Sequence, residues 1–280
     1  MALMNVSFFS PTLRRTVPLT VVIPTDKQLP GQPGYQQAAP YKTLYLLHGA
    51  FGSCLDWLSG TRMRPLAQNA NLCVVMPSGE NKFYADSKTS GDRYGTFVSE
   101  DLVNFIESTF PVSKKREDRF IAGLSMGGYG AVVNGLRHPE TFGAIGAMSS
   151  AFLKKRILNS VDEPGRDLFT RTEYMTMFGL DDVKDFEGSE HDYDMLARKA
   201  ARRKKKPDIY LCCGTEDSLL PVNHQFRELL SELGYNMTYE EWEGDHNWKF
   251  WDEAIEKLIN WLPLGEAVKG VSSENVQQKK

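Results

Sequence analysis

Apolar and polar residues alternate along this chain with two different spacings. Short, nearly uninterrupted apolar runs predict buried strands, at residues 43–47, 72–76, 120–122, 142–148 and 207–213. Other segments carry apolar residues at helical spacing and predict helices, at residues 62–69, 97–110, 129–137, 193 onward, 222–233 and 248–262. This alternation indicates an α/β fold in which a mostly parallel sheet has helices on both faces.

The ends of the chain extend this pattern. Residues 6–9 and 16–23 are rich in β-forming residues and predict a leading antiparallel pair, and the alternating residues 237–242 predict a final strand. Residues 30–40 are rich in Gly, Pro and Gln and predict a surface loop. The polar loop at 81–94 is long enough to suggest a functional role.

One segment interrupts the alternation. Residues 149–206 are polar, charged and irregular, and the sheet pattern resumes directly after them. A segment of this kind predicts a lid or cap inserted over the sheet rather than a separate domain. We therefore expect a single domain over residues 1–264 and a disordered polar tail at 265–280.

Composition and charge narrow the classes of partner. The chain has 280 residues, of which 41% are apolar and 25% are charged, and its net charge is −3. This balance is typical of soluble globular domains and gives no reason to expect nucleic acid or an anionic membrane as a partner. The basic run at residues 202–206 has no interleaved aromatic residue, and we interpret it as a solvated helix end. The sequence leaves homo-oligomer formation open.

The expected location is cytoplasmic. No apolar stretch reaches the length of about 18 residues that would predict a membrane-spanning helix. Residues 1–11 lack a basic region before an apolar block, so no signal peptide is expected, although one removed earlier would leave no trace. The cysteines have no metal-type spacing, and we interpret them as free thiols in a reducing compartment: Cys54, Cys73, Cys212 and Cys213.

The candidate nucleophile is Ser125. It lies in Gly-Leu-Ser-Met-Gly, residues 123–127, which matches the Gly-x-Ser-x-Gly elbow. An apolar run enters this motif and a helix-compatible stretch leaves it, so the strand–turn–helix context that the motif requires is present. Such a turn exposes the serine hydroxyl, and the glycines let the strand and the helix pass close together. A Gly-rich turn with a purely structural serine is the alternative.

A serine hydroxyl needs a base to remove its proton, and the base needs an acid to orient it. His246 follows the last predicted strand, and Asp217 follows the strand before it. The chain order Ser125, Asp217, His246 is the order found in α/β-hydrolases, which predicts that fold. Asp245 is the rival acid, but its position next to His246 disfavours a triad geometry. A surface-loop histidine and a turn-capping aspartate are the structural alternatives.

Two backbone amides must stabilise the oxyanion. Met126 supplies one, because it directly follows the nucleophile. Ala50 is the expected second donor, on the Gly-rich turn after an early strand, with Gly49 or Phe51 as alternatives. Trp57 and the aromatic residues of 149–206 are candidates for lining an acyl or aryl pocket, with packing within the lid as the alternative use.

With these motifs the chain resembles the esterase D and tributyrin esterase family of α/β-hydrolases. This family includes feruloyl and acetyl-carbohydrate esterases and S-formylglutathione hydrolase. The resemblance spans about residues 5–261 and rests on LLHG (46–49) with Trp57, VVMP (74–77), Tyr84, Tyr94 with EDL (100–102), GLSMGGYGA (123–131), GTED (214–217) and GDHNW (244–248). It implies the same triad and oxyanion donors, and no metal or organic cofactor.

One departure from the family pattern bears on the substrate. Formylglutathione hydrolases usually carry Thr-Cys after the oxyanion-loop glycine, where this chain has Ala50 and Phe51. The expected activity is therefore that of a serine carboxylesterase acting on short-chain acyl or hydroxycinnamoyl (feruloyl-type) esters of small molecules. A thioester hydrolase, an acyltransferase with the same triad and a non-catalytic binding module remain alternatives.

Overall fold

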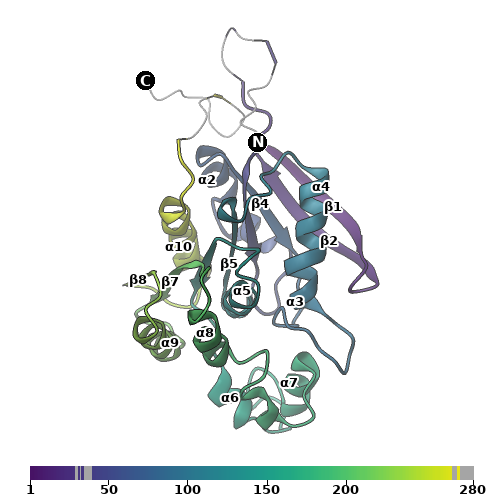
Figure 1. Cartoon of the computed structure of the whole chain (residues 1–280), viewed down its shortest axis with the longest axis vertical. Coiled ribbons are helices and arrows are strands. Elements are labelled where there is room, and N and C mark those ends of the chain that lie inside the picture. The colour runs from purple at the N-terminus through teal and green to yellow at the C-terminus, as the bar shows by residue number, and fades with distance from the viewer. Residues whose placement is uncertain (29–30, 32, 35–39, 267–269, 272–280) are drawn as a thin grey trace.

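A twisted mixed sheet forms the centre of the computed structural model, which describes residues 1–28, 31, 33–34, 40–266 and 270–271 (Figure 1). Within the described residues it has eight strands in the order β1-β2-β4-β3-β5-β6-β7-β8. Their bounds are β1 Ala2–Ser10, β2 Arg15–Ile23, β3 Lys42–Leu47, β4 Leu72–Pro77, β5 Arg119–Leu124, β6 Ala144–Met148, β7 Asp208–Gly214 and β8 Met237–Trp242.

The strands from β4 to β8 in this order pair in parallel, whereas β1 and β2 add an antiparallel pair at one edge. Strands β3 to β7 read as continuous apolar runs because helices cover both faces of the sheet. The register places Leu47 beside Gly123, and Leu124 beside Met148. The loops after β3, β5 and β6 therefore meet at one edge of the sheet.

Helices form a layer on each face of the sheet. Their bounds are α1 Asp56–Gly60, α2 Met63–Asn69, α3 Tyr94–Thr96, α4 Leu102–Thr109, α5 Met126–Arg137, α6 Lys154–Leu158, α7 Arg171–Phe178, α8 Tyr193–Ala201, α9 Leu220–Glu232 and α10 Trp248–Trp261. Helices α1, α2 and α10 contribute to one apolar core, and α4, α5, α8 and α9 contribute to the other. A π-helical turn, Phe97–Asp101, joins α3 to α4, and short 3-10 turns lie at Arg116–Asp118 and Val183–Phe186.

The α/β fold expected from the apolar pattern is confirmed, including the leading antiparallel pair and the alternation of strands and helices. The helix expected at 97–110 begins earlier, at Tyr94, and ends at Thr109. The loop expected at 30–40 and the tail expected at 265–280 lie mostly outside the described residues.

The segment between β6 and β7 holds α6, α7 and α8. Figure 1 shows α6 and α7 gathered beyond the end of the sheet, while α8 lies nearer α5. Neighbouring parallel strands need a crossover connection, and α8 provides it for β6 and β7 by packing against α5. Among the helices of the described residues, none has the length and apolar character needed to cross a membrane.

Candidate active site

Ser125 lies at a sharp turn between β5 and α5. Its backbone has a positive φ of 53°, with ψ −117°, a strained conformation for a residue other than glycine. Hydrogen bonds hold the turn: the Ser125 amide donates to the Met148 carbonyl at 2.9 Å, and the Ala151 amide donates to the Ser125 carbonyl at 3.0 Å. The strand–turn–helix context predicted for residues 123–127 is present.

Glycine is required at Gly127 by close approach rather than by its φ angle. A Cβ atom there would lie 2.5 Å from the carbonyl oxygen of Leu47 and 2.6 Å from that of His48. Both atoms belong to the backbone, so neither can move aside cheaply. The start of α5 therefore packs directly on the end of β3, which brings the loop after β3 beside the nucleophile.

The structure brings Ser125, His246 and Asp217 together. His246 Nε2 lies 3.0 Å from Ser125 Oγ, and His246 Nδ1 lies 2.8 Å from Asp217 Oδ2. The loops that carry the two partners are joined by the Glu216 amide, which donates to the Gly244 carbonyl at 3.0 Å. The Asp217 side chain is buried, while 31% of the His246 side chain is exposed. The base can thus reach both the serine and a bound substrate.

Asp217 is held as a carboxylate. Its Oδ1 accepts a hydrogen bond from the Leu219 amide at 2.8 Å. Burial by itself would raise the pKa of Asp217, but the hydrogen bonds from His246 and Leu219 outweigh burial and hold the pKa below its usual value. The rival Asp245 is exposed, and its Oδ1 accepts the backbone amide of His246 at 2.7 Å. Asp245 therefore orders the loop, whereas Asp217 contacts the imidazole ring.

The loop after β3 presents the expected oxyanion donors. Within the described residues, the amides of Ala50 and Met126 have no hydrogen-bond acceptor. The Phe51 amide is occupied, because it donates to Asn81 Oδ1 at 2.7 Å. Gly49 lies close to the nucleophile, since a Cβ atom on it would be 3.5 Å from Ser125 Cβ. This arrangement leaves the amides of Ala50 and Met126 available, keeps Gly49 as the alternative to Ala50, and removes Phe51 from the alternatives.

His48 supports this loop in a fixed tautomer. Its Nε2 accepts the Gly79 amide at 2.9 Å, so its Nδ1 carries the proton and donates to the Gly49 carbonyl at 2.7 Å. Burial lowers the pKa of His48, which keeps the ring neutral at neutral pH. The Tyr84 hydroxyl donates to the His48 carbonyl at 3.1 Å. The length of the loop 81–94 was the signal that suggested a functional role. No local pattern identified Asn81 and Tyr84 as its contacts with residues 48–52, which we call the oxyanion loop.

The expectation for Trp57 is corrected. Its side chain is only 1% exposed and belongs to the core beneath α10. Its Nε1 donates to the Leu47 carbonyl at 3.0 Å, and its ring meets Trp248 edge-on with centroids 5.5 Å apart. Trp57 therefore fixes the end of β3 from below, and this placement does not support a contact with substrate.

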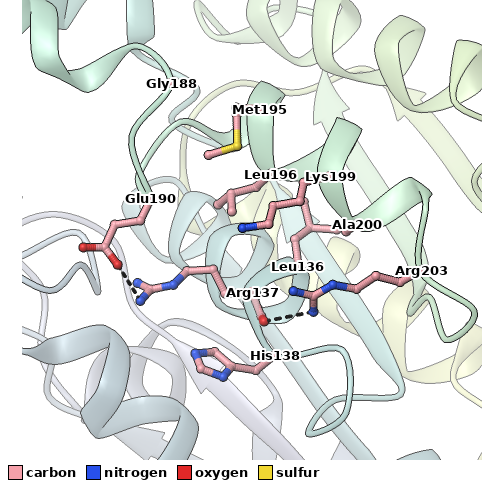
Figure 2. A pocket seen from close by; sticks show the side chains of 10 residues that line it. All are labelled: Leu136, Arg137, His138, Gly188, Glu190, Met195, Leu196, Lys199, Ala200 and Arg203. Atoms are coloured by element: carbon pink, nitrogen blue, oxygen red, sulfur yellow. Dashed lines mark hydrogen bonds and ion pairs between the residues drawn. The ribbon is translucent and has the colours of Figure 1, made fainter.

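A separate cleft of about 390 Å³ lies between α5 and α8 (Figure 2). In Figure 2, Arg137 lies between Glu190 and Arg203. The guanidinium of Arg137 pairs with Glu190 at 2.8 Å, and Arg203 donates to the Arg137 carbonyl at 3.3 Å. Because α5 begins beside Ser125 and ends at Arg137, this cleft is remote from the nucleophile. Among the described residues, no group of His, Cys, Asp and Glu side chains could hold a metal ion.

Comparison with known proteins gives consistent findings. A family described as putative esterase matches residues 21–262. The chain is 36% identical to an acetyl esterase of Caldicellulosiruptor saccharolyticus over 263 residues, covering 94% of this chain and 98% of that protein.

Solved structures of hydrolases are also similar to this chain. The fluorophosphonate-binding serine hydrolase F, FphF, of Staphylococcus aureus is 30% identical, with a TM-score of 0.80 and coverage of 93% of this chain and 98% of that one. An S-formylglutathione hydrolase, FrmB, of the same organism is 30% identical with a TM-score of 0.78 and the same coverage.

Proposed function

The chain belongs to the putative esterase family and is a carboxylic-ester hydrolase with the α/β-hydrolase fold, and from this premise we propose that Ser125, His246 and Asp217 hydrolyse short-chain acyl or hydroxycinnamoyl esters. The observation that carries this assignment is the continuous hydrogen-bonded chain from Ser125 Oγ through the imidazole to Asp217, with distances of 3.0 and 2.8 Å. It is the arrangement that activates a serine hydroxyl.

Acylation uses each of these groups. His246 Nε2 takes the Ser125 proton while Oγ attacks the ester carbonyl, and the resulting oxyanion is held by the amides of Met126 and Ala50. The imidazolium, stabilised by Asp217, then gives its proton to the leaving alcohol oxygen as the ester C–O bond breaks. The alcohol departs and an acyl group remains on Ser125.

Deacylation repeats the sequence with water. His246 removes a proton from a water molecule, whose oxygen attacks the acyl carbonyl in the same oxyanion hole. The proton returns to Ser125 Oγ as the acyl bond breaks, which releases the carboxylic acid. No group other than the triad, two amides and water is required for this cycle.

A thioester hydrolase is the second candidate. The likeness to an S-formylglutathione hydrolase over nearly the whole chain favours it. Ala50 and Phe51, which replace the Thr-Cys pair expected after the glycine, favour the ester hydrolase, as does the higher identity to an acetyl esterase.

A substrate panel tests the assignment. We expect wild-type protein to hydrolyse p-nitrophenyl acetate and butyrate or methyl ferulate faster than S-formylglutathione. Ser125→Ala should lower kcat by at least about 10⁴-fold, because no nucleophile remains. Retained hydrolysis in Ser125→Ala would overturn the mechanism, and a strong preference for S-formylglutathione would favour the second candidate.

A further inference from the structure

Phe51 is an exposed aromatic residue held in a strained conformation beside the oxyanion loop. Its side chain is 68% exposed, although it is large and apolar. Its φ is 63°, in the left-handed region that bulky residues rarely adopt. The hydrogen bond from its amide to Asn81 Oδ1, at 2.7 Å, holds this conformation. Strain of this kind is concentrated at functional sites, and Phe51 directly follows the oxyanion donor Ala50.

The ring of Phe51 packs against an aromatic residue of the segment after β6. Its centroid lies 5.7 Å from that of Phe169, which is itself packed against Phe83 with centroids 5.9 Å apart. Leu168, next to Phe169, is 48% exposed. We call Phe51, Leu168 and Phe169 the apolar rim. Phe169 is 5% exposed and anchors the rim, while the other two residues present apolar surface to solvent.

Sheet order decides which part of an ester lies against this rim. Strand β3, which leads to Phe51, lies on one side of β5, and β6, β7 and β8 lie on the other. His246 follows β8, so the base approaches Ser125 from the side opposite to the loop of Phe51. The leaving oxygen must lie beside His246 Nε2, because that atom gives it a proton. The carbonyl oxygen points to the amides of Ala50 and Met126. The acyl group then takes the remaining direction from the reacting carbon, away from His246 and beside the residue that follows Ala50.

We propose that the apolar rim binds the acyl group of the substrate and that Phe51 selects uncharged, apolar acyl groups longer than acetyl. This inference rests on the proposed function and narrows its substrate class. An acetyl group is too short to cover the rim, whereas a butyryl, hexanoyl or aromatic acyl group removes apolar surface from water. Phe51 is thereby a specificity-determining residue, and its strained backbone keeps the ring at the mouth of the site.

A series of esters with one leaving group tests this assignment. The measurement is kcat/KM for p-nitrophenyl acetate, butyrate and hexanoate. In Phe51→Ala, we expect the hexanoate-to-acetate ratio to fall about tenfold, mainly through KM, because contact with the acyl chain is lost. Phe51→Tyr should retain the ratio. Leu168→Ala, on a different segment, should lower it in the same direction and keeps the test valid if Phe51→Ala fails to fold.

Phe9→Ala is the matched control. Phe9 is also a largely exposed phenylalanine, at 62%, but it lies on β1 at the far edge of the sheet, so the ratio should not change. An unchanged ratio in both Phe51→Ala and Leu168→Ala, with acetate hydrolysis still dependent on Ser125, would overturn the role of the rim alone. If wild-type protein hydrolyses none of the esters, or Ser125→Ala remains active, the proposed function itself fails.

Discussion

Two neighbouring aspartates show how much a single residue's placement decides. Asp217 is buried and accepts the imidazole Nδ1–H, whereas Asp245 is exposed and accepts the backbone amide of His246. In the proposed mechanism the fixed carboxylate selects the imidazole tautomer with a free Nε2 and stabilises the imidazolium. The pKa of Asp217, held below its usual value by its hydrogen bonds in spite of burial, keeps it charged throughout the neutral range.

The two substitutions to asparagine should therefore differ. Asp217→Asn is expected to lower kcat on p-nitrophenyl acetate by about 10³–10⁴-fold, since an amide can stabilise the wrong tautomer. Asp245→Asn, on the loop that carries His246, is the matched control and should stay within a few-fold of wild type. Thermal unfolding of each variant checks that the fold persists. A large loss in Asp245→Asn with little change in Asp217→Asn would reassign the acid.

At the scale of elements, the strand–turn–helix unit around Ser125 was predictable because its chemistry imposes a local pattern. The crossing of β5 and α5 needs small residues at fixed positions, and these appear as Gly-x-Ser-x-Gly. Trp57 was not predictable in the same way. Its packing role depends on Trp248, which is remote in sequence. A local pattern cannot distinguish an aromatic residue beneath a loop from one that lines a pocket.

The segment between β6 and β7 shows the same limit. Helix α8 was expected, because its apolar residues have helical spacing. In the structure it packs against α5. Helices α6 and α7 were not, because their short lengths hold too few apolar positions to establish a period. For α7 the signal that could have been used is its capping box, in which Thr170 and Glu173 exchange hydrogen bonds at the first turn.

Close packing of α5 on the end of β3 makes Gly127 sensitive to substitution. Gly127→Ala should cost about 1–3 kcal/mol in the free energy of unfolding, because its methyl group would clash with backbone oxygens of β3 and the oxyanion loop. The same clash displaces Ser125 relative to Ala50, and a shift of about 1 Å can lower kcat about 10²-fold. Urea unfolding and kcat on p-nitrophenyl acetate measure the two effects.

Gly234→Ala is the control, because it adds backbone strain at a positive φ without a steric clash. Gly234 lies just after the C-cap of α9 with φ 68°, has open space where a Cβ would lie and is remote from the triad. It should lose about 1 kcal/mol through its left-handed backbone and keep wild-type kcat. Wild-type kcat and stability in Gly127→Ala would show that the elbow tolerates a larger separation from β3.

At the scale of the whole molecule, charge is unevenly placed around the active site. A cleft of about 290 Å³ next to His246 is lined by exposed acidic residues together with Lys249: Glu216, Glu243, Asp245 and Glu253. In the proposed mechanism the leaving oxygen lies at His246, whose chain neighbours Asp245 and Asn247 line this cleft. Neutral alcohols are unaffected by these carboxylates, whereas glutathione, with two carboxylates and one ammonium, carries net negative charge and is repelled.

This uneven charge predicts that kcat/KM depends on the acidic residues for the thioester substrate and not for the ester substrate. In Glu216→Gln with Glu243→Gln, we expect kcat/KM for S-formylglutathione to rise about two- to fivefold at low salt, while p-nitrophenyl acetate is unchanged. Raising the ionic strength of wild-type assays should act in the same direction, because the Debye length falls to about 8 Å at physiological salt. Glu228→Gln with Glu232→Gln, both on α9 and remote from His246, removes the same number of charges and is the control. If the double variant leaves the thioester unaffected, or if added salt slows it, glutathione does not approach along the acidic cleft and the charge argument for neutral leaving groups fails.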